Sequence, residues 1–246
     1  MARKKPVPTD KPTTAQTLAA WLVHMFTASG AILALLALLA VEDGEWVLAL
    51  MWLLIALIVD GVDGSLARWA KVKERAPRVD GDTLDLVIDY LTYVFVPTLF
   101  LWRAGLLPEA LAPWLAAGIQ LSALYLFART DMKTEDGYFR GFPALWNLVA
   151  FYLFVLQPGT AIGAIVVVLF IAMTFAPIHF VHPFRVRSYG VWLPLLAGLW
   201  AISTCALLWP DAPSLTRQGL TIVSVAAAVL LFALGLRRSF GGAAIR

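Results

Sequence analysis

The chain has 246 residues, of which 61% are hydrophobic and only 14% are charged, and its formal net charge is +3. A soluble domain carries about 25% charged residues, and the apolar residues here also come in long unbroken runs. These features exclude an ordinary soluble protein and predict a polytopic membrane protein. The single cysteine, Cys205, lies in an apolar run, so no disulfide can form within one chain.

The first 17 residues are basic and rich in proline, and we expect residues 1–17 to form an arm before the first membrane helix. Eight apolar segments follow, each close to the roughly 20 residues that a membrane-crossing helix needs. These segments are 18–41, 46–67, 83–102, 110–128, 141–157, 160–178, 189–209 and 218–236. The predicted fold is therefore all-α, with about eight transmembrane helices in a membrane domain over 18–238 and a tail over 239–246.

Basic residues lie mostly on one side of this arrangement. If the N-terminus is cytoplasmic, most of the 19 Lys and Arg residues fall in cytoplasmic connections, whereas the opposite side receives only Arg103 and Arg217. An excess of positive residues marks the cytoplasmic loops of membrane proteins. We therefore expect both termini in the cytoplasm.

Four aspartates gather at the cytoplasmic ends of the second and third segments. Asp60 and Asp63 are three residues apart, and Asp85 and Asp89 are four apart. Each spacing places its pair on one helical face, and the short connection lets the two pairs face each other. Carboxylates this close repel one another unless they are protonated or bind a divalent cation. Oxygen ligands favour Mg²⁺, Mn²⁺ or Ca²⁺ over zinc, and two such ions would suit a displacement at phosphorus.

A plainer interpretation is that these aspartates only cap helices at the membrane interface. Asp80 and Asp82, which lie just outside the third segment, suit that role. Asp89 does not, because it lies about two turns inside an apolar helix, where an ionisable side chain is costly and commonly functional. The sequence thus favours a functional carboxylate cluster.

The spacing of these residues resembles a family signature. The pattern of eight fixed positions is Asp60-x2-Asp63-Gly64-x2-Ala67-Arg68, then Gly81-x3-Asp85-x3-Asp89. It is similar to the motif of the CDP-alcohol phosphotransferases, integral membrane enzymes that make phospholipid headgroups. The resemblance implies a six-helix core, to which this chain adds two C-terminal helices, and a site that opens to the cytoplasm. It also implies two divalent ions, Mn²⁺ or Mg²⁺, held by the four aspartates, with Asp89 as the base for the acceptor hydroxyl.

The same resemblance assigns a nucleotide site beside the metal ions. Gly64 and Ala67 would let the cytidine nucleotide approach the backbone, which is what small residues allow. Arg68 and Gly81 would lie by the nucleotide or its phosphates. Thr27, in the first segment, would also reach the nucleotide, or would instead form a hydrogen bond between helices.

Three further segments, 23–30, 129–147 and 182–188, resemble the bacterial phosphatidylcholine synthases of that family. This implies transfer of a phosphatidyl group from CDP-diacylglycerol to choline, with release of CMP, in the bacterial inner membrane. Proteins hold a quaternary ammonium by aromatic faces and negative charge. Tyr90, Tyr138 and Trp146 lie near cytoplasmic helix ends and are the choline-binding candidates, although helix packing explains each of them singly.

Several alternatives stay open. The alternative within the same family is another acceptor alcohol: serine, glycerol 3-phosphate or inositol phosphate. A cation channel would spread its acidic residues along the path of the ion, whereas here they gather at one face; a purely structural membrane protein would not need the fixed spacing. We expect CDP-diacylglycerol, choline and membrane lipids as partners and no nucleic acid, and a homodimer is possible.

Overall fold

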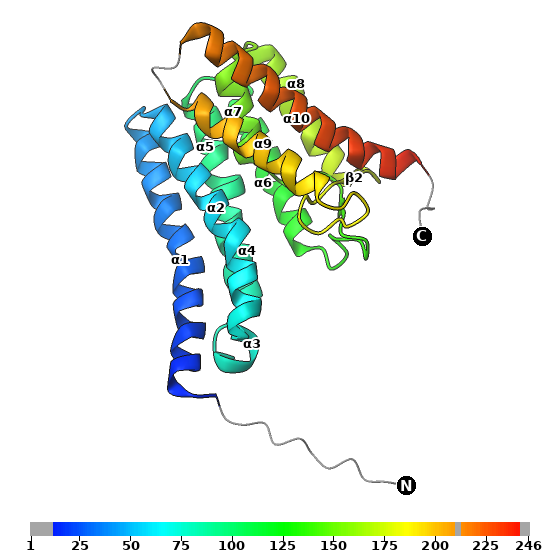
Figure 1. The fold of residues 1–246 in the computed structure, drawn as a ribbon. Coiled ribbons are helices and arrows are strands. Elements are labelled where there is room, and N and C mark those ends of the chain that lie inside the picture. Colours follow the sequence, from blue (N-terminus) through cyan, green and yellow to red (C-terminus); the bar gives the residue numbers. More distant parts are fainter. Residues whose placement is uncertain (1–11, 210–212, 242–246) are drawn as a thin grey trace.

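The computed structural model describes residues 12–209 and 213–241, and within these ranges the chain is mostly helical. The helices are α1 (Thr14–Glu42), α2 (Trp46–Ala70), α3 (Val72–Arg75), α4 (Gly81–Asp89), the π-helical segment η1 (Tyr90–Phe95), α5 (Val96–Arg103), α6 (Ala112–Ala128), α7 (Trp146–Leu156), α8 (Thr160–Phe175), α9 (Trp192–Leu207) and α10 (Ser214–Phe240). Each of the eight predicted segments coincides with helix, with α4, η1 and α5 together forming the third. Figure 1 shows α1, α2 and α4 side by side, with α9 and α10 crossing the other half of the molecule obliquely.

Helix α1 begins at a capping box, and small residues line its buried face. The Gln16 backbone N–H donates to the Thr13 hydroxyl, and the Gln16 side chain accepts from the Thr13 N–H. The buried face of the helix is made largely of small side chains: Ala20, Thr27, Gly30, Ala34, Ala37 and Ala40. Small residues at this spacing let membrane helices approach closely, and α1 accordingly packs along both α2 and α4.

The third segment, Gly81–Arg103, is one continuous helix interrupted by a π-helical turn. It begins at an N-cap, Asp80, whose carboxylate accepts from the N–H groups of Asp82 and Thr83. At the end of η1 the Val96 N–H bonds to the Leu91 carbonyl five residues earlier. Pro97 follows at once and has no N–H for the carbonyl four residues before it, so the hydrogen-bond ladder must shift here.

The helices α6, α7, α8 and α9 are shorter than predicted. Residues 141–145 are not helical, because Pro143 lies there and Ala144 has a φ of 55°, so α7 starts at Trp146. Helix α8 stops at Phe175, before Pro177. The fourth, fifth, sixth and seventh predicted helices correspond to α6, α7, α8 and α9, which have 17 residues or fewer.

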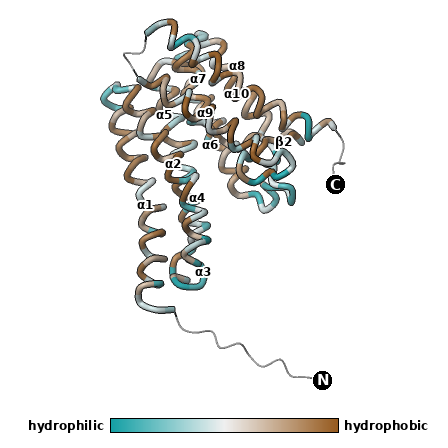
Figure 2. Tube along the Cα trace, viewed as in Figure 1, coloured by the Kyte–Doolittle hydropathy of each residue, from teal (hydrophilic) through white to brown (hydrophobic). Residues whose placement is uncertain are grey.

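Within residues 12–209 and 213–241, four helical segments are long and apolar enough to cross a membrane: Thr14–Glu42, Trp46–Ala70, Gly81–Arg103 and Ser214–Phe240. The four shorter helices are apolar as well, but at 1.5 Å per residue a 16-residue helix spans about 24 Å, less than the roughly 30 Å of a hydrocarbon core. Large apolar side chains remain exposed on many helices, for example Met25, Leu121 and Ile202. Figure 2 shows the apolar residues along the helices. The chain is a multi-pass membrane protein.

The arm and the tail differ slightly from the prediction at their inner ends. Helix α1 begins at Thr14, inside the predicted arm 1–17, and α10 continues to Phe240, inside the predicted tail 239–246. Residues 1–11 and 242–246 lie outside the described residues. Both boundaries move because the helices continue past the apolar runs into polar sequence, where caps and tertiary contacts decide the helix end.

Two connections, 129–145 and 176–191, meet to form what we call the loop cluster. Strand β1 (Phe139–Arg140) pairs antiparallel with β2 (His179–Phe180), which adds a small sheet to the fold predicted as all-α. Each strand has two residues, too few for any alternation in the sequence to reveal. Polar residues gather here and around α3, as Figure 2 shows.

The two C-terminal helices dock on α7 and on the loop cluster. The Tyr152 hydroxyl of α7 lies 2.8 Å from the Ser224 hydroxyl of α10 and accepts from the Trp200 indole N–H of α9 at 2.7 Å. At the other end of α10, the Arg238 guanidinium donates to Asp136 at 2.9 Å, and the Ser239 hydroxyl accepts from the His179 N–H at 2.7 Å. Helix α10 thus holds the loop cluster from one side.

Candidate active site

Three of the four predicted aspartates meet between α2 and α4. One carboxylate oxygen from each of Asp60, Asp85 and Asp89 lies within 4.8 Å of the others, and all three side chains are half-buried. We call these three residues the carboxylate group. The spacing of three and four residues places each pair on one helix face, and the packing of α1 against both α2 and α4 holds the two helices together.

The carboxylate group fits a divalent cation. Asp89 Oδ1 is buried and has no hydrogen-bond partner among the described residues. A buried carboxylate oxygen without a donor is costly unless a cation or a proton neutralises it. Converging oxygen ligands without His or Cys favour a hard ion such as Mg²⁺, Mn²⁺ or Ca²⁺. These residues could therefore hold the predicted metal.

Asp63, the fourth predicted ligand, lies outside the carboxylate group. Its side chain is only 6% exposed, and its Oδ2 accepts a hydrogen bond from the Thr27 hydroxyl at 2.8 Å. Thr27 was predicted either to reach the nucleotide or to form a hydrogen bond between helices, and its hydroxyl forms such a bond to Asp63. Asp63 lies one turn of α2 beyond Asp60, and its role as a ligand stays a prediction.

Tyr93, one of the aromatic residues near the cytoplasmic helix ends, contacts the carboxylate group, which the sequence did not predict. Its hydroxyl donates to Asp60 Oδ2 at 2.6 Å, and its side chain is 6% exposed. Tyr93 lies in the π-helical turn, which changes the direction of every side chain from its place in a regular helix. Pro97, four residues later, is the one signal in the sequence that pointed to this irregularity.

The predicted nucleotide residues continue along α2 and onto the start of α4. Arg68 is exposed, and its guanidinium donates to the Ser65 hydroxyl at 3.0 Å. A Cβ at Gly64 would lie 3.5 Å from Arg68 Nη1, and a Cβ at Gly81 would lie 3.3 Å from the ring of His24. Ala67 packs on a small apolar cluster beside them. Their role in binding a nucleotide stays a prediction.

The three predicted choline residues do not come together. Tyr90 follows Asp89 directly; its hydroxyl donates to Gln120 of α6, and its ring packs edge-on against Phe127. Tyr138 is 3% exposed and packs in a separate cluster under α10, and Trp146 is completely buried in the main core. Of the three, only Tyr90 adjoins the carboxylate group.

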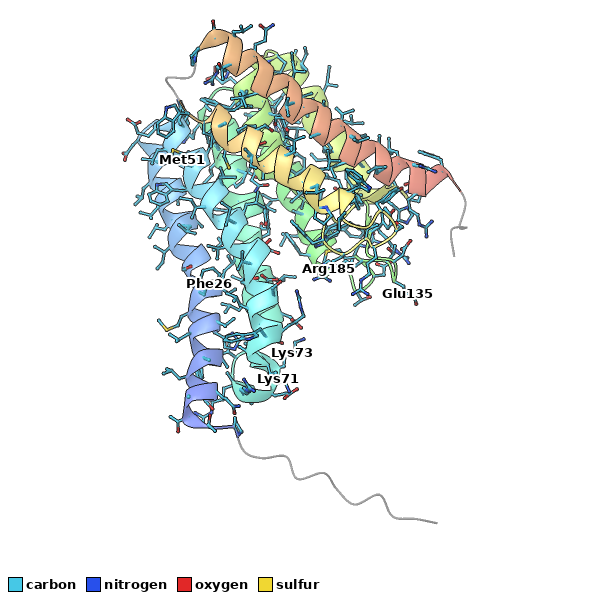
Figure 3. The ribbon with its side chains drawn as sticks, in the orientation of Figure 1. Phe26, Met51, Lys71, Lys73, Glu135 and Arg185 are labelled. Atoms are coloured by element: carbon cyan, nitrogen blue, oxygen red, sulfur yellow. The ribbon has the colours of Figure 1, made fainter. Side chains whose placement is uncertain are left out.

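The loop cluster brings cationic groups toward the carboxylates. The Lys133 ammonium lies 5.3 Å from the centre of the Phe139 ring, and the His182 ring stacks on Phe139 with ring centres 5.4 Å apart. Burial, together with the Arg185 guanidinium, lowers the pKa of Lys133, although Asp89, Asp85 and Asp60 are close enough for their charges to oppose that shift. Figure 3 labels Arg185 in this region.

His182 shares this environment. Burial, and then the positive charges of Arg185 and Lys133, lower the pKa of His182 to about 4. Gly137 fits against the Arg185 backbone only because it has no side chain, since a Cβ there would lie 3.0 Å from the Arg185 carbonyl and the residue has a φ of 90°. The cationic residues are therefore held by tight backbone packing between the two connections.

Comparison with known proteins agrees with the motif. Residues 17–200 match the family described as CDP-alcohol phosphatidyltransferase. A phosphatidylcholine synthase from Pseudomonas aeruginosa is 47% identical over 189 residues, which cover 77% of this chain and 79% of that protein. A phosphatidylcholine synthase from Bradyrhizobium diazoefficiens is 41% identical over 237 residues, or 96% of this chain and 85% of the relative.

A third phosphatidylcholine synthase, from Borreliella burgdorferi, is 41% identical over 169 residues, which cover 69% of this chain and 72% of that protein. The family match spans most of the chain and includes all four aspartates, the predicted nucleotide residues and the loop cluster. The resemblance inferred from the aspartate spacing is thereby confirmed: this chain belongs to the CDP-alcohol phosphatidyltransferase family.

Proposed function

We propose that this chain transfers the phosphatidyl group of CDP-diacylglycerol to choline, giving phosphatidylcholine and CMP. The observation that carries the proposal is the convergence of Asp60, Asp85 and Asp89 in a chain whose relatives are phosphatidylcholine synthases. The family membership supports the reaction type. The name of the relatives supports the acceptor.

The metal ions are Mn²⁺ or Mg²⁺, and we propose two of them. Asp60, Asp85 and Asp89 would hold them, with Asp63 as the fourth ligand. When bound, such ions neutralise the negative charge of a pyrophosphate and of the leaving phosphate. The unpartnered Oδ1 of Asp89 supports this assignment.

In the proposed reaction one bond to phosphorus forms as another breaks, and a carboxylate takes up the released proton. Asp89 accepts the proton of the choline hydroxyl, whose oxygen forms a bond to the phosphorus that bears the diacylglycerol. The bond from that phosphorus to the bridging oxygen breaks, and CMP leaves with that oxygen. Asp89 suits this role because it lies one turn further along α4 than Asp85 and has a buried oxygen without a donor.

Choline would lie next to Asp89, so that its hydroxyl reaches the carboxylate. Tyr90 is the predicted aromatic residue at that place, and its ring face supplies the type of contact that a quaternary ammonium needs. Trp146 has no exposed surface to offer a ligand, so we no longer place it in the choline site. Tyr138 lies under α10, and it would act through the loop cluster.

A phosphorylated acceptor, such as glycerol 3-phosphate or inositol phosphate, is the second candidate. The positive charges of Lys133 and Arg185 favour an anionic ligand. Lys133 is close enough to the carboxylate group to interact with its charges. In the choline reaction the same two residues would face the phosphates of CDP-diacylglycerol. The choice between the two acceptors therefore rests on assay.

We also propose that the protein lies in the bacterial inner membrane, crosses it eight times with both termini in the cytoplasm, and opens its site to the cytoplasm. The uneven distribution of Lys and Arg supports this orientation. The lipid substrate stays in the bilayer while choline and CMP exchange with water, which requires a site near the interface.

The test is CMP release by the purified protein in detergent with CDP-diacylglycerol and Mn²⁺. Choline, serine, inositol, glycerol 3-phosphate and inositol phosphate are supplied in turn, each with and without EDTA. We expect release with choline, abolished by EDTA. Release with a different alcohol only would overturn the acceptor, and release that EDTA does not affect would overturn the metal site.

A further inference from the structure

The two pairs of aspartates differ in how their carboxylates are held. On α2, Asp60 receives a hydrogen bond from Tyr93 of η1, and Asp63 receives one from Thr27 of α1. On α4, neither Asp85 nor Asp89 receives a side-chain donor from the described residues. One pair is therefore fixed by hydroxyl groups from neighbouring helices, and the other pair is left free of such bonds.

The Tyr93–Asp60 hydrogen bond is well suited to orient a ligand. The phenol carries no charge, so it does not repel a cation as Lys or Arg would. Its side chain is only 6% exposed, and its ring is packed in the main core, so its hydroxyl has little freedom to move. A hydroxyl fixed in this way limits the rotation of the carboxylate that it contacts.

Tyr93 reaches Asp60 from within the π-helical turn. In a regular helix Tyr93 would lie directly over Asp89, four residues earlier, and would share its face. The turn adds a residue to the ladder at 90–95, as the bond from the Val96 N–H to the Leu91 carbonyl shows. Such turns occur frequently at functional sites. Pro97 favours the turn at this position, because it has no N–H to donate to the regular helical ladder.

From these contacts we propose that Tyr93 is a positioning residue, which orients the Asp60 carboxylate within the carboxylate group and thereby sets the affinity of the site for a divalent cation. This inference rests on the metal site proposed above. It assigns the residue a role through Asp60 and no contact with the substrates.

The test is direct Mn²⁺ binding to the purified protein, with free Mn²⁺ measured by electron paramagnetic resonance. Residues that orient a metal ligand typically change affinity by about 10–100-fold, so we expect Tyr93→Phe to weaken Mn²⁺ binding by that factor. Tyr152→Phe is the matched control, because it removes a hydroxyl that is hydrogen-bonded between helices but far along the chain from the carboxylates. We expect it to bind Mn²⁺ as the wild type does.

Two further readouts separate positioning from damage to the fold. In the transfer assay, Tyr93→Phe should need more Mn²⁺ for half-maximal CMP release yet recover most of its kcat at saturating Mn²⁺. In an Asp60→Asn background, Tyr93→Phe should cause no additional loss of Mn²⁺ affinity, because it acts through Asp60.

The outcomes are distinct. Wild-type affinity in Tyr93→Phe, or an additive loss in the double variant, overturns the role of Tyr93 and leaves the metal site standing. A wild-type protein that binds no Mn²⁺ overturns the metal site and this inference with it. If Tyr93→Phe does not fold, Tyr93→Met, which also lacks the hydroxyl and has a flexible apolar side chain that adapts to a core, is measured instead, and wild-type Mn²⁺ affinity there overturns the role of Tyr93.

Discussion

The carboxylate group and the loop cluster are supported by different kinds of structure. Asp60, Asp85 and Asp89 project from α2 and α4, which run beside α1 over several turns. Lys133 and His182 belong instead to the two connections of the loop cluster. These connections are joined by a sheet of two short strands and held by the end of α10 (Figure 1). One region is built on long helices, the other on a few contacts between distant segments.

The two kinds of support suit two different roles. Groups placed on helices keep their geometry well, which suits metal ligands and a catalytic base. Loops held by a few polar contacts adjust more readily and commonly carry specificity. We therefore propose that the helices hold the metal ligands and the base, whereas the loop cluster contacts the substrates. Of the two added helices, α10 contributes directly, because it holds the loop cluster in place.

The largest effect is expected from the catalytic base on the helical side. Asp89→Asn keeps the size of the side chain but removes its ability to accept a proton. Loss of a general base typically costs about 10²–10⁴ in rate, so kcat for CMP release should fall by that factor and should not recover at saturating Mn²⁺. Retention of wild-type kcat would remove Asp89 from the mechanism.

A pair of glycines compares the two regions directly. In Gly30→Ala the new Cβ would lie 2.5 Å from Ile88 Cγ2, next to Asp89; in Gly235→Ala it would lie 2.3 Å from the His179 carbonyl of the loop cluster. Overpacking typically costs about 1–3 kcal/mol, so both should lower the thermal midpoint. Only Gly30→Ala should lower Mn²⁺ affinity, whereas Gly235→Ala should raise KM for the substrates.

Gly198→Ala is the control for this pair, because no atom lies within 4 Å of its new Cβ in α9. It should leave activity unchanged and raise the midpoint slightly, since Ala favours a helix over Gly. Equal effects of the two test variants on Mn²⁺ affinity would contradict the division between the regions.

A smaller effect concerns the pH dependence of the loop cluster. The pKa of His182 is about 4 in the folded protein and about 6.5 when it is free of the fold. The unfolded chain therefore binds more protons between these values, so His182 makes the protein less stable as the pH falls from about 6.5 to 4. His182→Phe, which keeps an aromatic ring against Phe139, should flatten the fall of the thermal midpoint over this range. An unchanged slope would show that other groups cause it.

The sequence predicted the helical side of the molecule better than the loop side. The spacing of the aspartates is local, so helical geometry alone placed Asp85 and Asp89 on one face opposite Asp60. The hydrogen bond from Tyr93 to Asp60 was not predicted, because the two residues are 33 apart in sequence and because Tyr93 lies in the π-helical turn. The bond from Thr27 to Asp63 joins two helices, and a single sequence does not reveal which polar groups pair between helices.

The loop side depended on information that the sequence pattern does not carry. Trp146 was expected near the membrane surface and is completely buried, because hydropathy does not distinguish a lipid-facing aromatic residue from one inside the bundle. The pairing of Phe139 with Phe180 joins segments about 40 residues apart. Pro143 and Pro177 disfavour a helix at the residues just before them. On that ground the sequence could have predicted the later start of α7 and the earlier end of α8.

We propose that the carboxylate group binds the divalent cation on which the transfer depends. The most direct measurement is Mn²⁺ binding and CMP release, on the same preparations, for Asp85→Asn and for Glu42→Gln, which changes a carboxylate at the opposite end of α1 that pairs with Arg103. We expect Asp85→Asn to lose both Mn²⁺ binding and CMP release while its thermal midpoint stays near that of the wild type, and Glu42→Gln to keep all three. Wild-type Mn²⁺ binding and turnover in Asp85→Asn would contradict the account.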